Sequence, residues 1–169
     1  AYYPIAVAIL DAGLTCSASL PCPGEMGASI HISGTASSIV DTVFVCRSTG
    51  TVPRKWITDD PRVTAKMVRH NLSELVLGGV KPTAGDIRCV AYCHMIRLAI
   101  WHLRKNWEPT STVAGRLNAI ASWIESTLGG IPAVLNALGK DFSNAPSQQP
   151  MYLREELPRY EGKNESISF

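Results

Sequence analysis

The chain has 169 residues, 46% of them hydrophobic and 18% charged, and its net charge is +2. This composition excludes wholesale disorder, collagen and coiled coil, and no apolar run reaches the roughly 18 residues of a membrane-spanning helix. At about 100–200 residues per domain, the length predicts one domain with at most a small appendage. The first residue is Ala and no basic segment precedes an apolar one, so we expect no signal peptide and a chain that is processed or belongs to a longer protein.

The cysteine content and the charge distribution narrow further the class of protein to which the chain can belong. Five Cys residues at irregular spacing do not fit a secreted disulfide scaffold, which predicts reduced thiols in a cytoplasmic protein. Residues 54–105 carry ten Lys or Arg against four acidic residues, whereas residues 1–53 are almost uncharged. This distribution is typical of a buried sheet element followed by helices that face an anionic partner; a solvated helix surface explains it equally well.

The front of the chain predicts one helix and two strands. Residues 2–12 are apolar at helical spacing and stop at Gly13. Leu14–Leu20 alternates as a strand does, and residues 21–37 form a long loop. Ser38–Arg47 is dense in β-branched and aromatic residues on both faces, which predicts a strand that is covered on both sides. The two strands should pair antiparallel, with the helix packed on one face.

The pattern then changes to a helical period. Asp60 followed by Pro61 predicts the start of a helix that ends at Gly78. Thr83 and Asp86 have the spacing of a capping box, which opens a second helix.

Two more helices and a tail complete the chain. A cap at Thr110 or Ser111 predicts a third helix that ends at Gly129, and a short fourth helix follows over Ile131–Leu138. The predicted organisation is a sheet-forming segment, a helical subdomain and an extended tail, over residues 1–53, 54–142 and 143–169.

Several short motifs of the front segment stand in a characteristic order. It reads YYPIAVAILDAGLTCSASLPCPGEM and, after a gap, GTASSIVDTVFVCR; the motifs are Ala12-Gly13-Leu14, Pro21 with Glu25, Ser37-Ser38 and Val45-Cys46-Arg47. This order resembles the C-terminal end of a family of adenine-specific DNA methylases, long bacterial and archaeal proteins with an N-terminal domain of unknown function. The helical remainder is similar to the family more loosely, through Thr83–Arg88 and Arg116-Leu117.

The resemblance implies an α/β fold, namely the terminal helix-strand-strand of a Rossmann-like methyltransferase sheet followed by a mostly α-helical subdomain. Sheets of this class end with a helix, a sixth strand and an antiparallel seventh strand that lies between the fifth and the sixth. The full enzyme would transfer a methyl group from S-adenosylmethionine to adenine in DNA without a metal. The implied partners are DNA and the missing catalytic part or a second copy of the chain, and no membrane is involved.

The catalytic motifs of such an enzyme are absent from this sequence. There is no glycine-rich loop after a strand and no Asp/Asn-Pro-Pro-aromatic motif, which would hold the flipped adenine. We therefore assign no catalytic residue, and we expect the chain alone not to bind S-adenosylmethionine. The alternative function is a non-catalytic helical binding or assembly module that retains a methylase-like hairpin.

Two groups of residues are candidates for contact with DNA or with a ligand pocket. Glu25, Ser29 and His31 lie in the long loop, at the sheet edge where open α/β folds bind ligands. Arg97 and Arg104 share a helix face beside an aromatic residue, a pattern that suits nucleic-acid phosphates. Turn-forming residues and solvated or paired arginines are the competing interpretations.

Cys89 and Cys93, with His94 and His102 close by, have one feature of a zinc site, since both thiols lie on one helix face. Structural zinc normally requires a second pair of ligands on another element, and the sequence offers none. Buried free thiols are the better interpretation, and no metal is expected.

Overall fold

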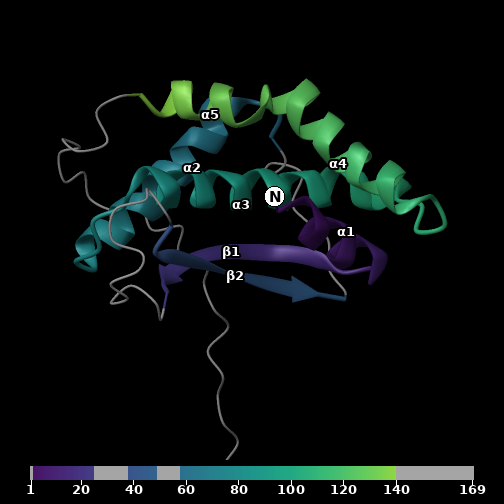
Figure 1. The fold of residues 1–169 in the computed structure, drawn as a ribbon, viewed down its shortest axis with the longest axis horizontal. Coiled ribbons are helices and arrows are strands. Elements are labelled where there is room, and N and C mark those ends of the chain that lie inside the picture. The colour runs from purple at the N-terminus through teal and green to yellow at the C-terminus, as the bar shows by residue number, and fades with distance from the viewer. Residues whose placement is uncertain (1, 25–37, 49–57, 140–169) are drawn as a thin grey trace, which may run out of the picture.

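The computed structural model describes residues 2–24, 38–48 and 58–139, which form a mixed α/β arrangement that is mostly helical (Figure 1). In chain order the elements are α1 (Tyr3–Asp11), β1 (Thr15–Pro23), β2 (Val40–Arg47), α2 (Pro61–Leu77), α3 (Ala84–Leu103), the 3-10 turn η3 (Arg104–Asn106), α4 (Val113–Leu128) and α5 (Gly130–Leu138). The expected order of helix, two strands and four helices is confirmed. Within the described ranges, no helix is long and apolar enough to cross a membrane.

The two strands pair antiparallel, as the sequence predicts, in a register that runs from Thr15 opposite Arg47 to Pro23 opposite Val40. The predicted end of β1 at Leu20 is wrong, because the strand continues through two prolines to Pro23. The amide of Gly24 donates to the carbonyl of Ile39 on the β2 side. In a strand, the backbone N–H groups of residues two positions apart point to the same side. Pro21 and Pro23 therefore occupy positions whose N–H would point away from β2, so the missing N–H groups remove no hydrogen bond between the strands.

The predicted caps of α2 and α3 are confirmed. Asp60 accepts a hydrogen bond from the amide of Arg62 at the start of α2, and Pro61 occupies the first position, where its missing N–H costs nothing. Thr83 and Asp86 form a reciprocal capping box at the start of α3.

The predicted cap of α4 is wrong. The capping side chain is Thr112, which accepts from the amide of Gly115, and neither Thr110 nor Ser111 takes that place. The end of the helix follows the prediction: Gly129 adopts a left-handed φ of 69°, which side chains rarely tolerate. Gly130 also has a positive φ, and a Cβ there would collide with the carboxylate of Glu125. This pair of glycines allows α5 to begin directly after α4.

One hydrophobic core joins the front segment to the helices, although the sequence suggests a boundary after residue 53. Its members come from α1, β1, β2 and all the later α-helices, and the largest buried side chains include Leu72, Met95, Ile96, Ile120 and Ile124. Figure 1 shows α3 lying along the hairpin, with α2, α4 and α5 farther out on the same side. The main cover of the hairpin is therefore α3, whereas the sequence suggests the first helix.

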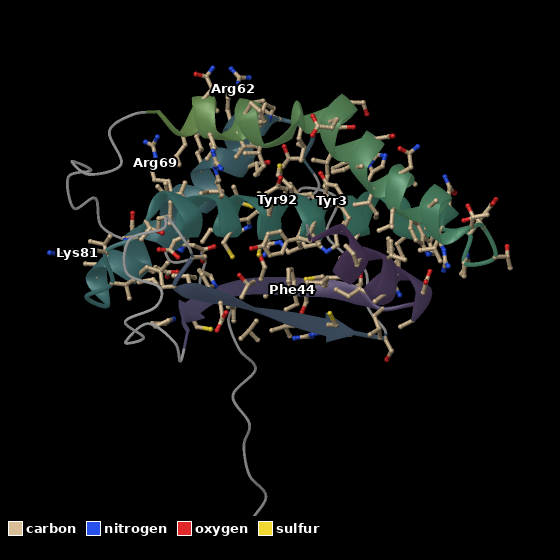
Figure 2. All side chains as sticks on the ribbon, viewed as in Figure 1. Tyr3, Phe44, Arg62, Arg69, Lys81 and Tyr92 are labelled. Carbon is tan, nitrogen blue, oxygen red and sulfur yellow. The ribbon has the colours of Figure 1, made fainter. Side chains whose placement is uncertain are left out.

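The opposite face of the hairpin has no cover among the described residues. Leu20 and Val43, which are direct partners in the register, are 50% and 51% exposed. Phe44 points to the other face and packs partly buried against the core; Figure 2 shows its position on β2. The predicted burial of β2 on both faces is thus met on one face within the described part of the chain.

Candidate functional site

A cavity of about 380 Å³ lies beside the segment that leads into β2 and the first turns of α3. Its walls come from the residue before α1, the segment before β2 and the first turns of α3: Tyr2, Ser38, Ala84, Gly85, Arg88, Cys89 and Tyr92. The cavity combines an arginine, a thiol and two tyrosine rings on its walls. It is the strongest candidate site in the described structure.

Asp86 joins two of the segments that line the cavity, the residues before β2 and the start of α3. One carboxylate oxygen accepts hydrogen bonds from Ser38 Oγ at 2.8 Å, Ile39 N at 2.7 Å and Val40 N at 3.0 Å. The other accepts from Thr83 N at 2.7 Å and Thr83 Oγ1 at 2.8 Å. Burial opposes the charge of Asp86, but these hydrogen bonds outweigh it and hold the pKa of the carboxyl below its ordinary value. The helix cap of α3 is therefore also the anchor that fixes where β2 begins.

The thiol of Cys89 lines the cavity, and the thiol of Cys93 lies close to it. Cys93 Sγ is 3.1 Å from Thr42 Oγ1 and donates to it, while Cys89 Sγ is 3.8 Å from the same hydroxyl and 3.7 Å from the carbonyl oxygen of Val40. A hydroxyl that accepts from one thiol can donate to the other, so Thr42 links the pair. The neighbouring Cys93 thiol, the Tyr2 hydroxyl and Thr42 lower the pKa of Cys89, against the effect of burial. The bond to Cys89 and burial raise the pKa of Cys93.

Aromatic rings form the mouth of the cavity. The rings of Tyr2 and Tyr92 lie 5.2 Å apart between centroids, and Tyr3 meets Tyr92 edge-on at 6.4 Å. Figure 2 shows Tyr3 and Tyr92 side by side above the hairpin. The hydrogen bond with Cys89 and burial raise the pKa of the Tyr2 hydroxyl, which stays protonated and can donate into the site. The cavity thus combines aromatic walls, a thiol and the guanidinium of Arg88.

The arginines that sequence analysis singles out do not form one surface. Arg97 points inward between α2 and α3: its Nη2 is 3.4 Å from Met67 Sδ, and its guanidinium lies 5.1 Å from the ring centre of Trp101. Arg104 donates to the carbonyl oxygens of Gly13, just before β1, and Ser48, just after β2, at the same end of the hairpin. Both side chains therefore have structural contacts. Glu25, Ser29 and His31 lie outside the described residues.

A second polar cluster, which the sequence does not reveal, lies deeper between α2 and α3. His94 Nε2 is 2.6 Å from Asn71 Oδ1, and His94 Nδ1 is 3.3 Å from Arg97 Nη2. Because an amide oxygen and a guanidinium have fixed roles, Nε2 must donate and Nδ1 must accept, which is the neutral ring. Burial, with the charge of Arg97, lowers the pKa of His94 to about 3. This network orders the core and does not open into the cavity.

The cavity residues have a signal in the sequence that periodicity could have found. Gly85, Arg88, Cys89 and Tyr92 follow one another at helical spacing on one face of α3. The sequence does not show that Tyr2 and Ser38 line the same cavity. Within the described residues, no three His, Cys, Asp or Glu side chains converge as a metal site would require, and all five cysteines are free thiols.

No family model, curated protein or solved structure matches this chain.

Proposed function

We propose that this chain is the C-terminal portion of a DNA adenine methyltransferase that uses S-adenosylmethionine, in which it completes the catalytic sheet and supports DNA recognition. The observation that carries the proposal is the half-covered hairpin. A helix, a strand and an antiparallel strand occur in the order in which sheets of this class end, and no described residue covers the face with Leu20 and Val43. The reaction in this proposal, methyl transfer to adenine, is inferred from the motifs of residues 12–47 that resemble the methylase family.

A two-stranded sheet is marginal in water without further strands or a cover on its faces. Among the described strands, β2 has β1 as its one neighbour, so its other edge exposes unpaired backbone groups. A strand of the preceding catalytic part would pair with that edge, and its helices would cover Leu20 and Val43.

The test begins with the coding sequence upstream of residue 1. The proposal requires a glycine-rich loop and an Asp/Asn-Pro-Pro-aromatic motif there, and the longer protein should transfer a radiolabelled methyl group from S-adenosylmethionine to adenine in DNA. Titration of this chain alone with S-adenosylmethionine in a calorimeter should give no binding at millimolar concentration. A start codon directly before residue 1 would instead favour the helical binding or assembly module.

A pair of variants in the longer protein tests the role of the hairpin. Val43→Lys places a charge on the bare face and should abolish methyl transfer, because the cover of that face is lost. Val113→Lys is the matched control, since Val113 is 60% exposed on α4, and it should leave the rate unchanged. Equal methyl transfer by the two variants would show that the catalytic part does not cover this face.

A further inference from the structure

Cys89 combines features that a merely structural thiol does not need. It is 4% exposed and yet lines the cavity, so that a small molecule inside the cavity meets its sulfur. Thr42 Oγ1 lies 3.8 Å from that sulfur and accepts from Cys93 at 3.1 Å, which leaves the hydroxyl proton of Thr42 for Cys89. The buried thiol of Cys16, in contrast, is 0% exposed and does not line the cavity.

We propose that Cys89 is a nucleophilic modification site that takes small, soft, negatively charged electrophiles through the cavity. Arg88 lines the same cavity, and none of the described residues forms an ion pair with it. Its guanidinium can therefore attract an anion to the thiol. The cavity holds about 380 Å³, and the packed rings of Tyr2 and Tyr92 form part of its wall, which favours a small reagent over a large one.

The charged and titratable groups around Cys89 are compatible with a thiolate. Thr42 Oγ1 on β2 lies 3.8 Å from the sulfur. The nearby Cys93 thiol on α3 and the Tyr2 hydroxyl before α1, together with Thr42, lower the pKa of the Cys89 thiol. Asp86, one turn earlier, is the opposing negative charge, and its two oxygens already accept five hydrogen bonds from Thr83, Ser38, Ile39 and Val40. Ionised thiols are the reactive form of cysteine, so this environment promotes attack.

The reaction is a simple displacement with iodoacetate as the probe. The thiol of Cys89 releases its proton to the buffer, its sulfur forms a bond to the methylene carbon of iodoacetate, and the carbon–iodine bond breaks with loss of iodide. No electron transfer and no further reactant are required. The product is a carboxymethyl thioether whose carboxylate can lie beside Arg88.

The experiment measures alkylation of all five thiols in the folded chain by peptide mass spectrometry. Cys16 is the internal reporter of unfolding, because it reacts when the core opens. We expect Cys89 to react with iodoacetate at least tenfold faster than Cys16, and faster than the more exposed Cys22 and Cys46. Reaction of Cys22 and Cys46 first, with Cys89 and Cys16 reacting together and late, would overturn the proposal.

Two substitutions test the contacts that carry the proposal. Thr42→Val should lower the rate at Cys89 relative to Cys16 several-fold, and Thr42→Ser should restore it. Arg88→Gln should lower the ratio of iodoacetate to iodoacetamide reactivity at Cys89, whereas Cys22→Ser should leave both readouts unchanged. Unaltered ratios in Thr42→Val and Arg88→Gln would show that neither contact activates the thiol. These results do not depend on the methyltransferase proposal, since every one is measured on this chain alone.

Discussion

Asp86 offers the sharpest test of how the hairpin and the helices are joined, through the substitution Asp86→Asn. The carboxylate is 0% exposed and serves two elements, with three donors from the start of β2 on one oxygen and two from Thr83 on the other. Asparagine keeps one acceptor oxygen and places an amide N–H where a donor already points. At least two hydrogen bonds are lost, and hydrogen bonds to a charged group contribute about 1.5–3 kcal/mol each.

We therefore expect Asp86→Asn to lower the free energy of unfolding by about 3 kcal/mol in urea denaturation followed by circular dichroism. The matched control is Asp60→Asn at the start of α2, where the capping carboxylate is partly exposed and its ion pair is with the exposed Arg62, a surface pair that contributes little. Asparagine caps helices as well as aspartate does, so the control should unfold at nearly the same urea concentration as the unchanged chain.

The dependence on pH gives a second readout of the same residue. Since the pKa of Asp86 is lower in the folded than in the unfolded state, its stabilising contribution is present above the ordinary value of 3.8 and is lost as the pH falls through the folded value. The difference between Asp86→Asn and the unchanged chain should shrink below pH 3.8. Equal unfolding midpoints for Asp86→Asn and Asp60→Asn at neutral pH would refute the role of Asp86 as the anchor of β2.

Three further predictions concern the core and the bare face. Burial lowers the pKa of His94 from 6.5 to about 3, so the folded chain should lose stability as the pH falls from 6.5 toward 3, by about 3 kcal/mol at pH 4. His94→Gln should flatten that part of a profile of urea midpoint against pH, and an unchanged slope would contradict a buried neutral ring. Trp101→Phe removes the indole N–H that donates to the carbonyl of Cys16 at 2.6 Å and should cost about 1–3 kcal/mol by urea denaturation, whereas no loss would show that water replaces the bond. Phe44→Ala should destabilise the chain clearly more than Val43→Ala, because Phe44 packs on the core and Val43 is half exposed; thermal unfolding compares them, and equal midpoints would mean that the two faces are equally covered.

Local rules explain which parts of the fold the sequence predicts well. Asp60 before Pro61, the spacing of Thr83 and Asp86, and Gly129 after an apolar stripe each depend on a few neighbouring residues. The pairing of the two strands follows from alternation and chain length. The missed cap at Thr112 shows the limit of such rules, because Thr110, Ser111 and Thr112 are all capping residues and the sequence does not say which one begins the helix.

The candidate site depends on contacts that no local rule contains. Asp86 is visible in the sequence as half of a capping box, but the hydrogen bonds that it accepts from Ser38, Ile39 and Val40 join residues more than forty positions apart. In the sequence, Arg97 and Trp101 lie on one helical stripe. This pattern fits two arrangements equally well: a surface that binds phosphate, or a buried arginine that packs over an aromatic ring. Packing against Met67 on α2 decides between the two, and periodicity does not reveal which element covers a face.

The composition of β2 connects the sequence to the proposed function. Val43 and Val45 on one face and Val40, Phe44 and Cys46 on the other make both faces apolar, although a strand with one wet face normally alternates with polar residues. In the described structure α3 covers only the second of these faces, and Val43 stays half exposed beside Leu20. Leu20 and Val43 form an exposed apolar pair on this face of the described hairpin, next to a strand edge with unpaired backbone groups. Exposure of such a surface to water is unfavourable, and further strands and helices packed on it would be stabilising. The strand therefore has the side chains of an interior position, which is where the antiparallel final strand of a methyltransferase sheet lies.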